Sequence, residues 1–170
     1  MRRLRAQRAP EGSRGTAQGC ADPAASAGTR AALVEAMLMP PMSRYMTRQP
    51  WTIRTDATMS QAHELMRAHA IRHLPVLDGG KLVGIVSERD LHLIETLPGS
   101  DPAKVSVEEA MVSDVYVVGP DDPVDVVVDH MAERKQGSAV VVDRRGAVEG
   151  IFTTVDALQV LADVLRQASA

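Results

Sequence analysis

The chain has 170 residues, of which 45% are hydrophobic, 24% charged and only 2% aromatic, a composition typical of a soluble globular protein of one domain. Its formal net charge is -3, and the first 36 residues hold six of the 19 basic residues, so the remainder is acidic and poorly suited to bind duplex DNA. The scarcity of aromatic residues also argues against a stacking surface for single-stranded nucleic acid. No apolar run is long enough to cross a membrane, and the single cysteine cannot form an internal disulfide, so we expect a cytoplasmic protein.

The segment 1–36 is rich in Arg, Ala, Gly and Ser and has no apolar period, so we expect it to be disordered. A plain tail, or a start codon assigned too early, is the favoured interpretation; the true start would then be Met37, Met39 or Met42. A transit peptide or a nucleic-acid-binding arm is a weaker alternative. The residues 31–39 predict a short helix that ends at the following prolines.

The chain repeats itself from Ser43 onward. A shift of 65 positions pairs Met46 with Met111, Trp51 with Tyr116, Ile53 with Val118, Met66 with Met131 and Asp78 with Asp143. Beyond Asp143 the shift becomes 66, which pairs Gly84 with Gly150 and Asp90 with Asp156. The added residue falls in a predicted turn, where insertions cost little.

Each copy predicts the same series of elements. The first predicts a strand at 51–53, a helix over 58–70 with a Thr58 and Gln61 capping box, strands at 73–77 and 82–86 joined by a Gly79-Gly80 turn, and a helix through Leu91, Ile94 and Leu97. The second predicts a strand at 116–118, a helix with Pro123 in its first turn, strands at 139–143 and 148–152, and a helix over 154–167. A hinge at 97–101 and a short helix capped by Ser106 and Glu109 connect the copies.

The sequence therefore predicts an α+β fold of tandem β-α-β-β-α repeats, with the first repeat at 43–100 and the second at 106–170. One such unit is too small to cover the faces of its own helices and sheet. We expect the two repeats to pack sheet to sheet as one pseudo-two-fold module.

The end of the last strand of each copy carries the same motif: glycine, two apolar residues, a hydroxyl residue and, three positions later, aspartate. The motif occupies 84–90 and 150–156. A hydroxyl followed by an acid three residues later caps a helix start, which is a sufficient structural explanation. The same groups also suit a nucleotide, because the hydroxyl and the N–H groups bind phosphate while the carboxylate accepts hydrogen bonds from ribose. The two interpretations are compatible.

The first copy resembles a cystathionine β-synthase (CBS) domain, and the second copy resembles its partner. The resemblance rests on residues 71–78, Ile-Arg-His-Leu-Pro-Val-Leu-Asp, on the hairpin, and on the following Gly-Ile-Val-Ser-Glu-Arg-Asp-Leu. The resemblance extends from Ser43 to the C-terminus. It implies a disc-like module that binds adenosine-containing ligands between its repeats and often forms homodimers. The ligand would be AMP, ADP or ATP, with S-adenosylmethionine or NAD as alternatives, acting as a regulatory ligand and not as a required cofactor.

The resemblance also implies roles for individual residues. Asp90 and Asp156 would bind ribose hydroxyls, and Ser87 and Thr153 would contact phosphate. The adenine of one site would be flanked by His73, Leu74 and Pro75 and by the backbone near Thr52 and Ile53. Arg72 and Arg89 supply cations in the first copy, whereas the second copy has Gly137-Ser138-Ala139-Val140 in place of 72–75 and Val155 in place of Arg89. We therefore expect unequal sites, with Ser138 in the weaker one and the first repeat binding better.

The function that the sequence favours is a regulatory, ligand-sensing module with no enzyme activity. An unknown regulated protein on another chain, or the homodimer itself, would respond to the ligand. The alternative is a structural dimerisation module in which the motifs only cap helices, and binding of nucleic acid or of a membrane is not expected. The five histidines do not show the spacing of a metal site, so no metal is predicted either.

Overall fold

The computed structural model describes residues 39–169, so the predictions for 1–36 and for most of the helix at 31–39 lie outside the described residues. Residues 42–95 form the 3-10 helix η1 (Met42–Arg44), β1 (Thr47–Arg48), β2 (Ile53–Arg54), α2 (Met59–His69), β3 (His73–Asp78), β4 (Lys81–Ser87) and α3 (Glu88–Glu95). They are followed by α4 (Val107–Ala110), β5 (Val117–Val118), α5 (Val124–Arg134), β6 (Ser138–Val142), β7 (Val148–Thr153) and α6 (Thr154–Ala168). The predicted series of elements is thus confirmed in both copies, and the fold is the predicted α+β arrangement.

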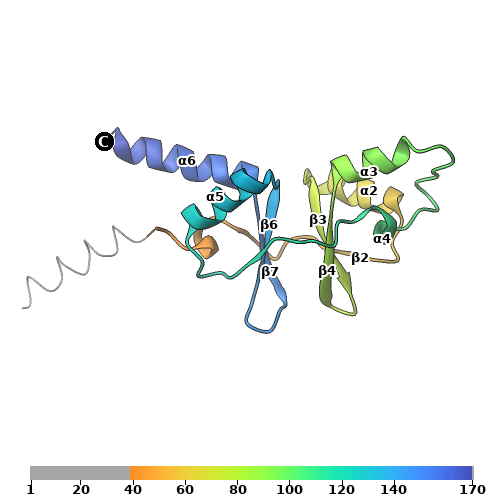
Figure 1. The fold of residues 1–170 in the computed structure, drawn as a ribbon, viewed down its shortest axis with the longest axis horizontal. Coiled ribbons are helices and arrows are strands. Elements are labelled where there is room, and N and C mark those ends of the chain that lie inside the picture. Colours follow the sequence, from red (N-terminus) through yellow and green to blue (C-terminus); the bar gives the residue numbers. More distant parts are fainter. Residues whose placement is uncertain (1–38, 170) are drawn as a thin grey trace, which may run out of the picture. The chain divides into compact units, whose positions relative to one another are not determined.

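The strands form two sheets, one for each repeat (Figure 1). The first has the order β2-β3-β4, with β2 parallel and β4 antiparallel to β3. The second has the order β1-β7-β6-β5, in which β5 to β7 repeat the arrangement of β2 to β4. The fourth strand, β1, was not predicted. It lies near the start of the first repeat in the chain but pairs with β7 of the second, with Thr47 opposite Ile151.

Each repeat contributes a short segment that pairs with the sheet of the other repeat. Val112, near the start of the second repeat, forms a bridge with Ile85 of the first, in which each N–H donates to the carbonyl oxygen of the other residue, with N to O distances of 3.0 and 2.8 Å. The repeats also pack closely at both of these pairings. A Cβ on Gly84 would lie 2.4 Å from the sulfur of Met111, and a Cβ on Gly150 would lie 2.5 Å from the sulfur of Met46. Only glycine leaves room for the methionine of the other repeat.

The two hydrophobic cores are completed in the same reciprocal way. The first contains Val107 and Ala110 of α4 among ten buried residues, and the second contains Met42 and Met46 among nine. Each repeat therefore buries the segment that leads into the other, and neither core is complete without its neighbour.

Helix boundaries follow from local caps. The Thr58 hydroxyl accepts a bond from the N–H of Gln61 at 3.3 Å, and the Gln61 side chain accepts one from the N–H of Thr58 at 2.9 Å, which starts α2 at Met59. Ala70, predicted as the last helical residue, instead has a φ of 53° and ends the helix. Among residues 39–169, no helix is both long and apolar enough to cross a bilayer.

Candidate functional site

A cleft of about 1150 Å³ lies between the two repeats, and residues of both line it. The first repeat contributes the segment from β1 to Trp51, the entry of β3 and the start of α3, and the second contributes the end of α5, the entry of β6 and the start of α6. The lining residues include Arg48, Trp51, Arg72, His73, Ser87, Glu88, Arg89, Lys135, Gly137, Thr153, Val155 and Asp156.

The hydroxyl and carboxylate of each repeated motif form a helix cap. The hydroxyl of Ser87 donates to Oδ2 of Asp90 at 2.6 Å, and its N–H donates to the same oxygen at 2.9 Å. Thr153 and Asp156 reproduce both bonds at 2.7 Å. Within residues 39–169, the other oxygen of each carboxylate accepts no hydrogen bond from protein groups. Capping therefore uses one oxygen and leaves Oδ1 for another donor, so the predicted structural and ligand-binding roles are compatible in geometry.

The two aspartates differ in position. Asp156 lines the cleft together with Thr153, whereas Asp90 is not among the cleft residues although Ser87 is. The cleft thus joins the carboxylate of the second repeat to the side chains of the first, including Arg72 and Arg89. The sequence predicts the better site around the motif of the first repeat, and the cleft itself is lined by residues of both repeats.

Charge in the cleft is predominantly positive. Four cationic side chains line it, Arg48, Arg72, Arg89 and Lys135, against the two carboxylates of Glu88 and Asp156. Arg48 already has protein partners, because its guanidinium donates to the carbonyl of Ser43 at 2.9 Å and lies 3.6 Å from the carboxylate of Glu149. The other three cations have no ion pair within the described residues. The excess of positive charge makes the cleft more favourable for an anionic than for a cationic ligand.

His73 lies at the contact between the repeats. A Cβ on Gly137 would lie 3.1 Å from Nε2 of His73, so the absence of a side chain at 137 leaves room for the imidazole. Burial lowers the pKa of His73 below its ordinary value; the Asp90 charge opposes this shift, whereas Arg72 and Arg89 reinforce it. The ring is therefore favoured in its neutral form, which can both donate and accept a hydrogen bond.

The remaining predicted site residues lie elsewhere. The side chains of Ile53 and Leu74 are part of the first core, and Pro75 is also buried. Thr52 is half-buried next to Trp51 but is not among the cleft residues, and Ser138 begins β6 opposite Thr153. Ile53, Leu74 and Pro75 therefore offer a ligand little beyond their backbone groups.

Two features of the site were not predicted. Trp51 lines the cleft and stacks on His69 with ring centroids 3.9 Å apart, and Tyr116 stacks on His130 at 4.0 Å in the second repeat. The alignment of Trp51 with Tyr116 was a signal that could have indicated this pair. The structure also brings His63, His92 and Glu95 together, although no metal site was predicted.

The profile of the CBS domain matches residues 42–93 and 107–163, which covers more than half of the chain and both repeats. The chain belongs to the CBS domain family. Among curated relatives, an inosine-5′-monophosphate dehydrogenase of Korarchaeum cryptofilum is 32% identical over 112 residues. The match covers 66% of this chain but only 22% of the dehydrogenase, so the similarity concerns the CBS pair and a small part of the relative.

Solved CBS structures agree with the fold. A protein of Vibrio cholerae assigned to acetoin utilization is 32% identical with a TM-score of 0.69, and the alignment covers 78% of this chain and 98% of that one. A CBS domain pair in complex with 5′-methylthioadenosine and S-adenosyl-L-methionine is 28% identical with a TM-score of 0.68, covering 74% and 98% of the two chains. The tandem repeat is therefore a CBS pair.

Proposed function

We propose that this CBS pair is a regulatory module that binds a phosphorylated adenosine in the cleft between its repeats. The observation that carries the proposal is the composite lining, in which Arg72 and Arg89 of one repeat face the cleft with Asp156 of the other. The free Oδ1 of Asp156 accepts hydrogen bonds from the ribose hydroxyls, and the two arginines bind phosphate. Both repeats then contact one ligand, so binding changes how they pack, and a partner protein or the homodimer responds to the change.

The charge of the cleft favours one class of adenosine ligand. The related CBS pair described above was solved with 5′-methylthioadenosine and S-adenosyl-L-methionine, which supports recognition of the adenosine group in this family. S-adenosylmethionine carries a positive sulfonium, which the four cations of the cleft disfavour. We therefore rank AMP, ADP and ATP above S-adenosylmethionine, with NAD between them.

Calorimetric titration of the full chain with AMP, ADP, ATP, NAD and S-adenosylmethionine tests the proposal. We expect at least one of the adenine nucleotides to bind more tightly than S-adenosylmethionine. Trp51 provides a second readout, because it is the only tryptophan of the chain and lines the cleft, so its fluorescence should change on binding. If none of the five ligands binds at millimolar concentration, the proposal is wrong.

Two matched variants separate ligand binding from helix capping. Asp156→Ala and Asp90→Ala remove equivalent capping carboxylates, so each should lower the free energy of unfolding by about 1 kcal/mol. Only Asp156 lines the cleft, so only Asp156→Ala should weaken nucleotide binding, by tenfold or more. Equal affinity in the two variants and the wild type would contradict the assignment of Asp156.

We also propose that the module forms a homodimer through α6. This helix has no buried residue, and Val155, Leu158, Leu161, Val164 and Leu165 are each more than half exposed. An apolar surface of this kind on a soluble protein is typical of an interaction site. Sedimentation equilibrium should give a dimer for the wild type and a folded monomer for Leu158→Asp. A monomeric wild type at tens of micromolar would contradict the proposal.

A further inference from the structure

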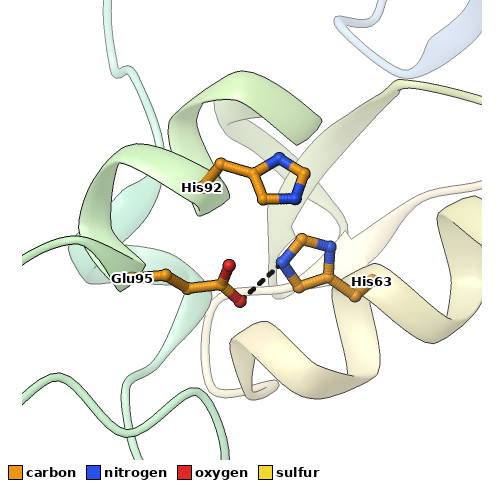
Figure 2. Close-up of side chains that lie close together, drawn as sticks. All are labelled: His63, His92 and Glu95. Atoms are coloured by element: carbon orange, nitrogen blue, oxygen red, sulfur yellow. Dashed lines mark hydrogen bonds and ion pairs between the residues drawn. The ribbon is translucent and has the colours of Figure 1, made fainter.

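Three groups that bind metal ions in proteins converge between α2 and α3 of the first repeat. His63 extends from α2, and His92 and Glu95 extend from α3, where they stand three residues apart on one side of the helix (Figure 2). Their ligand atoms all lie within 4.8 Å of one another. Nε2 of His63 lies 2.9 Å from Oε1 of Glu95, and the two imidazole rings are 5.1 Å apart between centroids.

These distances suit a transition-metal ion. Zinc binds imidazole nitrogen and carboxylate oxygen at about 2.0 to 2.2 Å, so neighbouring ligand atoms of a tetrahedral site are about 3.3 Å apart. The pair of His63 and Glu95 would open slightly and His92 would approach, which rotation of the exposed His92 side chain allows. We propose that His63, His92 and Glu95 bind a divalent cation of the zinc class. Two imidazoles and one carboxylate are a ligand set that zinc accepts, with a fourth position open.

The second repeat shows that the fold does not require these polar groups. By the shifts of 65 and 66 positions, His63, His92 and Glu95 correspond to Val128, Leu158 and Leu161. The same two helices therefore form in the second repeat with three apolar residues at these places. A hydrogen bond from His63 to Glu95 alone would tie α2 to α3, but it assigns no role to His92.

Burial argues in the same direction. The side chain of His63 is 17% exposed and that of Glu95 is 28% exposed, so both groups are largely removed from water. Polar groups in such places cost free energy unless they gain strong partners, and a bound cation is one.

The open side of the cluster meets a cavity of about 290 Å³, which His63, His92, Glu88, Arg67 and Arg72 help to line. A water molecule in this cavity would supply the fourth ligand. Arg67 and Arg72 reduce the affinity for a cation, so binding should be weaker than in a closed structural zinc site. This cavity shares Arg72, Glu88 and His92 with the nucleotide cleft, but the proposed metal site does not depend on nucleotide binding.

The test uses the full chain freed of any histidine tag and titrated with Zn²⁺ against a chromophoric chelator of known affinity. We expect one zinc ion to bind per chain, and Co²⁺ in its place to give the intense visible absorption of tetrahedral coordination. His92→Ala and Glu95→Gln should each lower the zinc affinity at least tenfold. His92 is exposed, so His92→Ala should leave the fold intact, which circular dichroism checks.

Three control variants exclude other ligands. His69→Ala and His130→Ala remove histidines that stack on aromatic rings away from the cluster, and Cys20→Ser removes the only thiol of the chain. All three should keep the wild-type zinc affinity. Absence of zinc binding in the wild type, or equal affinity in His92→Ala, Glu95→Gln and the wild type, would overturn the proposal. Neither outcome bears on nucleotide binding, because the titration contains no nucleotide.

Discussion

The two repeats share one series of helices and strands but differ in many side chains, and the places where the side chains differ are informative. Where the repeats depend on each other for packing, the residues match: Met46 and Met111 lie against Gly150 and Gly84. The backbone bonds at the cleft also match, since the N–H of Glu88 donates to the carbonyl of Arg72 at 3.0 Å and that of Thr154 to Gly137 at 3.1 Å. The repeats are therefore symmetric at these packing and backbone contacts.

Symmetry is lost where side chains face the cleft or the histidine cluster. Arg72 and Arg89 correspond to Gly137 and Val155, so the cations are concentrated on the first repeat. The carboxylate that faces them comes from the second repeat, at Asp156. The two repeats are therefore complementary in the cleft and equivalent in the core. We infer that their side chains differ because of ligand binding and not because of folding.

The largest effect should come from the symmetric glycines. Gly84→Ala and Gly150→Ala place a Cβ against a methionine of the other repeat, so each should lower the free energy of unfolding by about 1 to 3 kcal/mol, and by similar amounts. Gly119→Ala is the control, because its nearest neighbour would be 3.6 Å away and its effect should be neutral or slightly stabilising. Urea unfolding measures all three. A large loss at only one of the two glycines would break the symmetry inferred for the core.

The next effect concerns the cations of the first repeat. Arg72→Ala and Arg89→Ala should each weaken binding of the preferred adenine nucleotide by about tenfold, or about 1.4 kcal/mol, because each removes a charged partner of phosphate. Arg145→Ala, in the exposed turn before β7, should leave the affinity unchanged. Calorimetry at two salt concentrations checks the cause, since the wild type should lose more affinity in high salt than either cleft variant.

A gain of binding is expected from the reverse substitution. Val155→Arg gives the second repeat the cation that the first has at Arg89, in a residue that lines the cleft and is 58% exposed. Nucleotide affinity should rise by about threefold at low ionic strength, the size expected for one exposed charge pair. An unchanged or lower affinity would show that phosphate is bound away from the start of α6.

The smallest effect concerns pH. Because the pKa of His73 is lowered in the folded state, the unfolded chain binds more protons as the pH falls through the ordinary range for histidine, about 6.5. His73 therefore lowers the free energy of unfolding as the pH falls from 7 to 5. Above pH 7 the ring is neutral in both states, so it has no such effect. In His73→Gln the melting temperature should fall less over this interval than in the wild type, and identical pH dependence would contradict the burial of a neutral ring.

Local patterns explain which features the sequence predicts correctly. The Gly79-Gly80 turn, the cap of α2 and the start of α3 depend on residues within a few positions of one another, and all three occur as expected. The pairing of β1 with β7 joins residues about a hundred positions apart and has no local pattern. The resemblance implies that adenine lies beside Leu74 and the backbone near Ile53; that both side chains are buried in the first core depends on contacts between elements distant in the chain, which no local pattern gives.

The site was harder to predict for the same reason. The repeated hydroxyl and aspartate motifs could be located from the sequence. Which of them lines the cleft depends on how the two repeats face each other, so the sequence could not distinguish Asp90 from Asp156. The cluster of His63, His92 and Glu95 joins two helices separated by a hairpin, and no short spacing indicates it.

A crystal structure of the full chain with its preferred adenine nucleotide would show directly whether the ligand binds between the repeats. We expect one ligand in the cleft, with a ribose hydroxyl donating to Asp156 and the phosphate in contact with Arg72 or Arg89. A nucleotide bound at Asp90 with the cleft free of ligand would contradict it.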